Sequence, residues 1–179
     1  MDLEKALLAE HSKTQCSAIA DYIGDDPRKF ARLMKCFLSG EDLIRQRAGW
    51  PLSYCVQRYP NLARPYFDQL LKLLDTPNIH PAVSRNITRL FQYTPVPKRF
   101  QGRLMDACFG FISDPRSPIA VRAFSLSILE KMTQDYPEIL PEIQLIIEEH
   151  WDEASAAFRS RAKKIMAKTN QRFIRSASS

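Results

Sequence analysis

The sequence predicts an all-α fold, an α-α superhelix in which about four helix pairs and a terminal capping helix form a right-handed solenoid. An arginine recurs with spacings of 38, 37 and 39 residues, at Arg47, Arg85, Arg122 and Arg161. The segment Tyr59-Pro60-Asn61-Leu62 returns as Tyr136-Pro137-Glu138-Ile139. Repeats of this length are typical of stacked helix pairs, because each pair leaves an apolar face that its neighbours must cover.

Signals for β-strands are missing from the chain. It contains no Asn-Gly or Asp-Gly pair, only 5 glycines in 179 residues, and no run in which apolar and polar residues alternate. Hairpins and half-buried strands depend on these features. Helices separated by short turns therefore remain as the predicted regular structure.

Periodicity and helix breakers divide the chain into about nine helices. We expect a short helix before residue 10, then pairs at 12–23 with 27–39, 41–58 with 61–75, 79–92 with 98–113 and 116–134 with 137–150, and a last helix at 152–169. Prolines stand at or near the starts of the second helices, where their fixed φ suits the first turn: Pro27, Pro60, Pro97 and Pro137. The predicted organisation is a single repeat domain over residues 1–170 and a frayed polar and basic tail over 171–179.

Apolar residues within these helices follow the spacing of one buried face, as Val83, Ile87, Leu90 and Phe91 do. We expect one apolar layer through the repeats, represented by Leu70, Ile87, Leu104, Phe111, Ile128 and Ile146. Cys16, Cys36, Cys55 and Cys108 lie among such apolar positions and form no CxxC pair. They are expected to be free cysteines in the core of a protein from a reducing compartment.

The longest apolar stretches, such as 143–147, are far shorter than the roughly 20 residues that span a bilayer. The first residues lack the apolar core and cleavage site of a secretory signal. We therefore expect a cytoplasmic protein. The net charge of +6 is uneven, because residues 154–179 contain seven cations and no acid, whereas residues 1–153 contain 19 cations and 20 acids. The basic character thus belongs to the last helix and its tail.

In residues 112–129 an Asp114-Pro115 turn is followed by the helix opening Val121-Arg122-Ala123 and then by Ile128-Leu129. This segment resembles a HEAT repeat. The copy around Arg85 is weaker, with Ser84 and Asn86 beside the arginine, and the other two copies keep only an arginine followed by an alanine. The resemblance implies an α-α superhelix with a concave surface and does not identify a ligand.

Two interpretations of the repeated arginine remain open. Each guanidinium could bond turn carbonyls or an acid of the adjacent repeat, or the four together could line one face and bind phosphates or acidic peptide. A period equal to the repeat favours the structural interpretation. It predicts that Arg122 is at least half buried and bonded to a neighbouring turn.

The sequence shows no catalytic, cofactor-binding or metal-binding motif. Residues 148–153 combine acids, His150 and Trp151, but their spacing does not suit a metal, and Asp152 or Glu153 is better explained as the cap of the last helix. His11 and His80 lack identifiable partners. The candidate binding residues are the helical pairs Arg85 with Arg89 and Arg99 with Arg103; a further basic face comprises Arg28, Arg32 and Lys35.

These absences favour a binding protein over an enzyme. The leading hypothesis is a non-enzymatic adaptor, a scaffold that binds another protein through its concave or edge surface. The alternative is a nucleic-acid-binding protein, related in fold to the HEAT-like alkylpurine DNA glycosylases, whose catalytic residues find no match here. That role would use the last helix, through Arg159, Lys163, Lys164 and Lys168.

Overall fold

The computed structural model of the protein describes the backbone of residues 1–77 and 79–176, and side chains as far as residue 167 with the exception of residue 78. Within these residues the regular elements are α-helices and two 3₁₀ helices, and no strand occurs. The chain divides into two compact units, the first spanning Met1–Phe100 and the second beginning at Gln101. Helices of one repeat contact only their neighbours, so a repeat array has few contacts that tie distant parts together.

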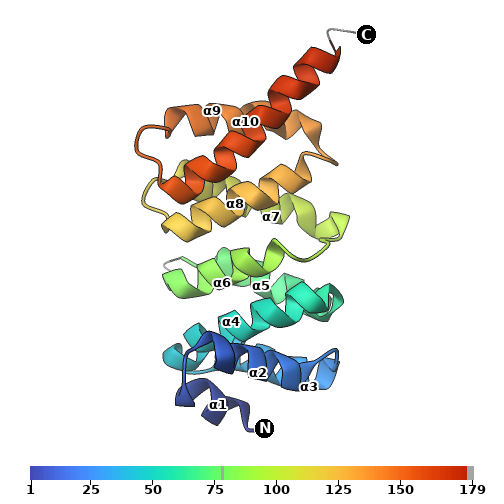
Figure 1. The fold of residues 1–179 in the computed structure, drawn as a ribbon, viewed down its shortest axis with the longest axis vertical. Coiled ribbons are helices and arrows are strands. Elements are labelled where there is room, and N and C mark those ends of the chain that lie inside the picture. Colours follow the sequence, from blue (N-terminus) through green and yellow to red (C-terminus); the bar gives the residue numbers. More distant parts are fainter. Residues whose placement is uncertain (78, 177–179) are drawn as a thin grey trace. The chain divides into compact units, whose positions relative to one another are not determined.

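The elements follow one another in the predicted order (Figure 1). In the first unit they are α1 (Leu3–Ala9), α2 (Lys13–Ile23), α3 (Pro27–Ser39), α4 (Asp42–Arg58), the 3₁₀ helix η1 (Pro60–Tyr66), α5 (Phe67–Leu74) and α6 (Pro81–Phe91). Helix α7 (Lys98–Ser113) begins in the first unit and continues in the second. The second unit adds α8 (Ile119–Met132), the 3₁₀ helix η2 (Pro137–Ile139), α9 (Leu140–Glu149) and α10 (Ala156–Ser176).

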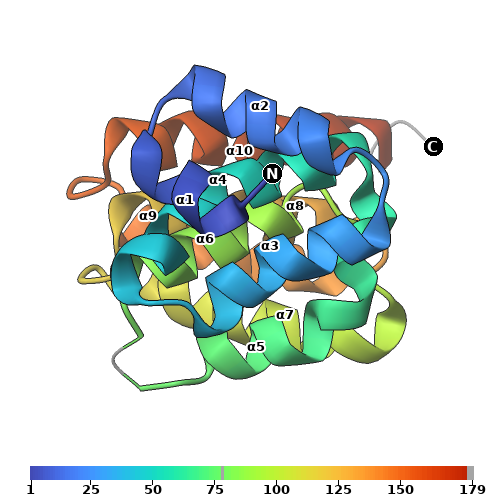
Figure 2. The ribbon, with the colours of Figure 1, turned by 90° about the horizontal axis from the view of Figure 1, so that it is seen from below.

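Within the first unit, α4 packs against α2, α3 and α6. Figure 2 shows α2 and α4 on one side of this unit and α3 and α5 on the other. In the second unit, α8 packs against α9 and α10. The all-α prediction is therefore confirmed for the described residues.

Local chemistry explains where several helices begin. The carboxylate of Asp26 accepts the backbone N–H groups of Arg28 at 2.8 Å and of Lys29 at 3.2 Å, and Pro27 occupies the first helical position. Ser12 caps α2 in the same manner, and His80 accepts the N–H of Ala82 on its Nδ1 at the start of α6. These side chains satisfy N–H groups that have no partner inside the helix.

Prolines also modify two predicted helices. The helix expected over 61–75 begins as the 3₁₀ helix η1, which contains Pro65, and only then continues as α5. The helix expected over 137–150 begins as η2 at Pro137. A proline ring supplies no N–H for the α-helical ladder, so the chain makes a tighter turn before the regular helix is established.

The last helix differs from the prediction at both ends. It begins at Ala156, and Ser155 Oγ accepts the N–H of Phe158 at 3.2 Å, so the cap is Ser155 and not Asp152 or Glu153. Serine and aspartate are equally good caps, and the sequence did not distinguish them. The described helix ends at Ser176, beyond the expected end at residue 169 and inside the segment predicted to be frayed.

Five of the six predicted core residues are buried: Leu70, Ile87, Leu104, Ile128 and Ile146. Phe111 is the exception, because it is half-buried while its neighbour Ile112 is fully covered. The buried stripe of α7 follows a spacing of four residues through Leu104, Cys108 and Ile112, and Phe111 lies beside that stripe. In the first unit, Phe67 is at the centre of the core, with its ring 5.3 Å from that of Phe91.

Helix α10 buries one side, as expected of a capping helix. Its apolar residues Phe158, Ala162 and Ile165, together with Ala154 just before its start, are at most 2% exposed, whereas Lys163 and Lys164 face solvent. The four cysteines are free and buried, and burial raises the pKa of the Cys55 and Cys108 thiols to about 12. None of the described helices combines the length and the hydropathy needed to cross a bilayer.

Candidate functional site

Arg47 on α4 spans the distance to α1. Its Nη1 donates to the carbonyl oxygens of Leu7 at 3.1 Å and Leu8 at 2.8 Å. These carbonyls belong to the last turn of α1, where the helix itself supplies no N–H partners. The Arg47 guanidinium therefore joins two elements and satisfies the end of one of them.

Arg122 on α8 is only 7% exposed. Its Nη2 donates to the carbonyl of Ile112 at 3.0 Å, and its guanidinium lies over the ring of Phe158, 4.7 Å from the centroid. Burial lowers the pKa of Arg122, while the more distant charges of Asp114 and Glu153 raise it. Arg122 thus has the buried, carbonyl-bonded position that the structural interpretation predicts, and it joins the end of α7 to α10 through α8.

Arg161 on α10 makes similar contacts. Its Nε donates to Ser127 Oγ at 2.9 Å, and its guanidinium lies 5.6 Å from the ring centroid of Phe124. Both partners belong to α8. Three of the four periodic arginines are therefore engaged with a neighbouring element.

Arg85 is the exception, because its side chain is exposed. The contact with the preceding repeat is made by the next residue, Asn86, whose Nδ2 donates to the carbonyl of Gln46 at 3.4 Å. A Cβ added to Gly49 would lie 2.0 Å from Asn86 Nδ2 and 2.6 Å from Asn86 Cβ. Helices α4 and α6 therefore approach so closely that only glycine fits at position 49, and Asn86 fills the space between them.

The other candidate cations are distributed over several elements. Arg89 is half-buried one turn after Arg85 on α6. Arg99 is exposed, with its guanidinium 4.7 Å from the ring centroid of Phe100, and Arg103 is half-buried. On α10, Arg159 is half-buried and Lys163 and Lys164 are exposed. Lys168 lies outside the residues whose side chains are described.

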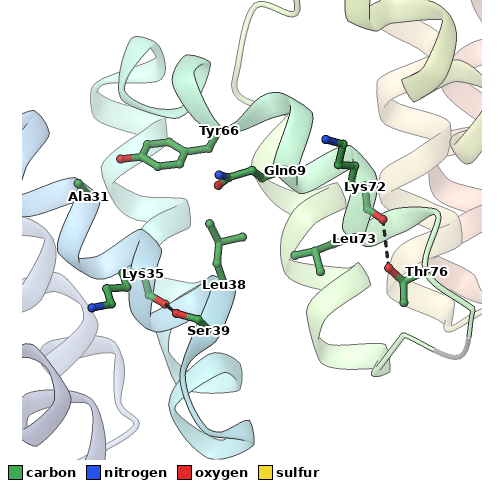
Figure 3. A pocket seen from close by; sticks show the side chains of 9 residues that line it. All are labelled: Ala31, Lys35, Leu38, Ser39, Tyr66, Gln69, Lys72, Leu73 and Thr76. Carbon is green, nitrogen blue, oxygen red and sulfur yellow. Dashed lines mark hydrogen bonds between the residues drawn. The ribbon is translucent and has the colours of Figure 1, made fainter.

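The first unit contains an open groove of about 630 Å³ between α3 and α5, which we call the α3–α5 groove. Its lining residues are Ala31, Lys35, Leu38, Ser39, Tyr66, Gln69, Lys72, Leu73 and Thr76. Figure 3 shows Leu38 and Leu73 facing the groove from opposite walls, with Tyr66 and Gln69 at one end. The walls are thus apolar at Leu38 and Leu73, and polar side chains surround these two leucines.

Charges at the groove are positive. The amine of Lys35 is exposed on the α3 wall, and that of Lys72 on the α5 wall pairs with Asp68 Oδ2 at 2.8 Å. The ring of Tyr66 packs against Phe30 with centroids 5.9 Å apart, and partial burial raises the pKa of the Tyr66 hydroxyl. The hydroxyl therefore stays protonated and able to donate.

Sequence reasoning found part of this groove. The basic face of Arg28, Arg32 and Lys35 was recognised from its spacing on one helix, and all three side chains are exposed. The apolar walls at Leu38 and Leu73 were missed as a site. Both leucines follow the helical period of the core, and only their half-buried state in the structure distinguishes them from core residues. Within the described residues no group of histidine, cysteine and acidic side chains could hold a metal ion.

A model of the HEAT repeat domain matches residues 3–169 of this chain. The match includes both units and every described helix except the end of α10. No curated protein and no solved structure matches the chain.

Proposed function

The chain belongs to the HEAT repeat family, and from this premise we propose that it is a helical-repeat scaffold, a non-enzymatic adaptor that binds a helical segment of another protein in the α3–α5 groove. The observation that most supports the proposal is the groove itself, in which two half-buried leucines face each other beneath a rim of polar and cationic side chains. Covering half-exposed apolar side chains removes their surface from water, which favours binding of a partner there.

The groove has the form that suits an amphipathic helix. A helix is about 10–12 Å across with its side chains, and its apolar residues at i, i+3, i+4 and i+7 can enter a groove whose walls are two parallel rows of side chains. An open groove would leave a small molecule largely exposed to water, whereas small-molecule sites bury most of their ligand. A peptide segment is therefore the better occupant.

The positive charge of the first unit indicates which residues the bound helix should carry. Residues 1–100 contain 15 Lys and Arg against 10 Asp and Glu, a net charge of +5. Lys35 is unpaired among the described residues, whereas Lys72 already has Asp68 as a partner. We expect acidic residues at the edges of the bound helix, with the one beside Lys35 contributing more to affinity than the one beside Lys72.

A displayed library of amphipathic helical peptides tests this proposal. The full-length protein should select peptides with an apolar face and acidic flanks, and Leu73→Glu should weaken their binding by at least tenfold because it places a charge in the apolar wall. Leu43→Glu is the matched control, since Leu43 on α4 is 48% exposed outside the groove. It should leave the affinity unchanged.

Two results would overturn the proposal. One is selection of peptides that bind wild-type protein and Leu73→Glu equally well. The other is failure to select any peptide together with binding of a DNA duplex at low salt, which would favour the nucleic-acid role expected for Arg159, Lys163 and Lys164.

A further inference from the structure

A second feature of the first unit lies away from the groove, where the connection between α1 and α2 meets α4. His11, in that connection, has its ring 5.3 Å from the ring of Trp50 on α4, with an edge-to-face angle of 70°. The ring of Tyr54, one turn further along α4, is 6.1 Å from Trp50. These aromatic contacts fix His11 beside the middle of α4.

Arginines of two helices act on the His11 imidazole. Partial burial lowers the pKa of His11, and the charges of Arg47 and Arg85 lower it further, so guanidinium groups from α4 and α6 both act on the imidazole. Arg89 lies one turn after Arg85 on α6; burial raises the pKa of Cys16 on α2, and the charge of Arg89 lowers that pKa to a smaller extent. Asn86, packed against Gly49, holds this part of α6 close to α4. We call Arg85, Arg89, Arg47 and His11 the His11 cluster.

The cations of the His11 cluster are poorly neutralised. The guanidinium groups of Arg85 and Arg89 form no ion pair or hydrogen bond within the described residues, and Arg47 uses one nitrogen for the carbonyls of Leu7 and Leu8. Both charges that act on His11 are positive. Two unpaired arginines four residues apart on one helix attract an anion with several acceptor oxygens.

Neighbouring cations do not extend the cluster along the surface. Arg58 on α4 is paired with Asp21, and Nε of Arg45 donates to the carbonyl of Phe37 at 3.2 Å. A nucleic-acid strand would need unpaired cations that follow successive phosphates. These two arginines of α4 already have partners, so the cluster offers one localised positive position.

We propose that the His11 cluster binds a single phosphate group carried on a phosphorylated side chain of the protein partner, with Arg85 and Arg89 as the principal donors. A phosphorylated residue carries about two negative charges and three acceptor oxygens, which suit two guanidinium forks better than one carboxylate does. The assignment to a protein partner depends on the proposed adaptor function. The anion site itself depends only on the residues of the cluster.

Nuclear magnetic resonance titrations of the full-length protein test this site, with inorganic phosphate and blocked phosphoserine as probes at constant ionic strength. Both probes should shift the His11 imidazole and Trp50 indole signals saturably, and blocked glutamate should bind at least tenfold more weakly than blocked phosphoserine. Arg85→Gln and Arg89→Gln should each weaken phosphoserine binding by about tenfold. Arg32→Gln, which removes an exposed arginine on α3, should have no effect.

The Leu73→Glu variant separates this proposal from the adaptor function, because it should lose peptide binding in the groove and keep its affinity for phosphoserine. Non-saturating shifts, or equal binding by wild type, Arg85→Gln and Arg89→Gln, would overturn the phosphate site. Equal affinities for glutamate and phosphoserine would overturn the assignment to phosphate. Tighter binding of an oligonucleotide than of phosphoserine, lost in Arg85→Gln, would overturn the assignment to a protein partner.

Discussion

Arg122 and Arg85 occupy equivalent positions in two repeats, 37 residues apart, yet their environments differ. Arg122 is buried over Phe158 and bonded to the carbonyl of Ile112. Arg85 is exposed, and its neighbour Asn86 makes the contact with the preceding repeat. The same sequence position therefore stabilises the stack in one repeat and leaves a cation at the surface in the other.

The residue after the arginine explains this difference. Ala48, Ala123 and Ala162 follow the three engaged arginines and are at most 1% exposed, so a small side chain fills the helix contact and the guanidinium makes the polar bond. At that position Asn86 is 5% exposed; its side chain fills the helix contact and also donates the hydrogen bond to the preceding repeat. Once the amide has taken over this role, Arg85 has no stacking partner and is available for a ligand.

The largest expected effect is at the contact that accommodates Asn86. Gly49→Ala should lower the free energy of unfolding by about 3 kcal/mol, because the new Cβ would overlap three atoms of Asn86. Gly102→Ala on α7 is the control, since no atom lies within 4 Å of a Cβ there. That substitution should stabilise the protein by roughly 0.5–1 kcal/mol, because alanine has the higher helix propensity. Urea denaturation measures the free energy of unfolding of both variants. A loss of under about 1 kcal/mol for Gly49→Ala would mean that α4 and α6 can separate freely.

A double-mutant cycle refines this comparison. Asn86→Gly removes all three atoms that a Cβ at position 49 would meet, so it should relieve most of the cost of Gly49→Ala. We expect a coupling energy of about 1–3 kcal/mol between the two substitutions. Additive losses would show that Gly49 is required for another reason.

The smallest expected effect concerns His11. Since the folded pKa of His11 is lowered, first by partial burial and then by Arg47 and Arg85, the folded protein should lose a little stability as pH falls through the ordinary histidine value of 6.5. Arg85→Gln should raise the pKa of His11, as followed by the chemical shifts of its imidazole. An unchanged titration in Arg85→Gln would place Arg85 too far from the histidine to share a ligand with it.

The sequence predicted the helical architecture well because its signals are local. Pro27 and Pro137 mark the starts of second helices, and the spacing of Phe158, Ala162 and Ile165 defines the buried side of α10. The role of Asn86 could not be predicted, since its partners Gln46 and Gly49 lie about 40 residues earlier in the chain. A departure from the repeat pattern at Asn86 was visible, but its consequence depends on how closely α4 and α6 approach.

The α3–α5 groove likewise depends on contacts between elements, which the sequence did not predict. Leu38 and Leu73 have the spacing of core residues, and whether a neighbouring helix covers them is decided by packing between elements. Lys35, the cation on the α3 wall, was easier to find, because it recurs with Arg28 and Arg32 on one helical face. Helical periodicity thus identifies the side of a helix, whereas the walls of a groove depend on the adjacent helix.

We conclude that Asn86 frees Arg85 from the stacking role that Arg122 performs. The most direct test is the free energy of unfolding of Arg122→Ala and Arg85→Ala, measured by urea denaturation under one set of conditions. Arg122→Ala should cost about 2–3 kcal/mol, because the Ile112 carbonyl loses its donor and Phe158 loses its cover. Arg85→Ala should change stability by no more than about 0.5 kcal/mol, as exposed substitutions do. Equal losses at the two positions would contradict the account.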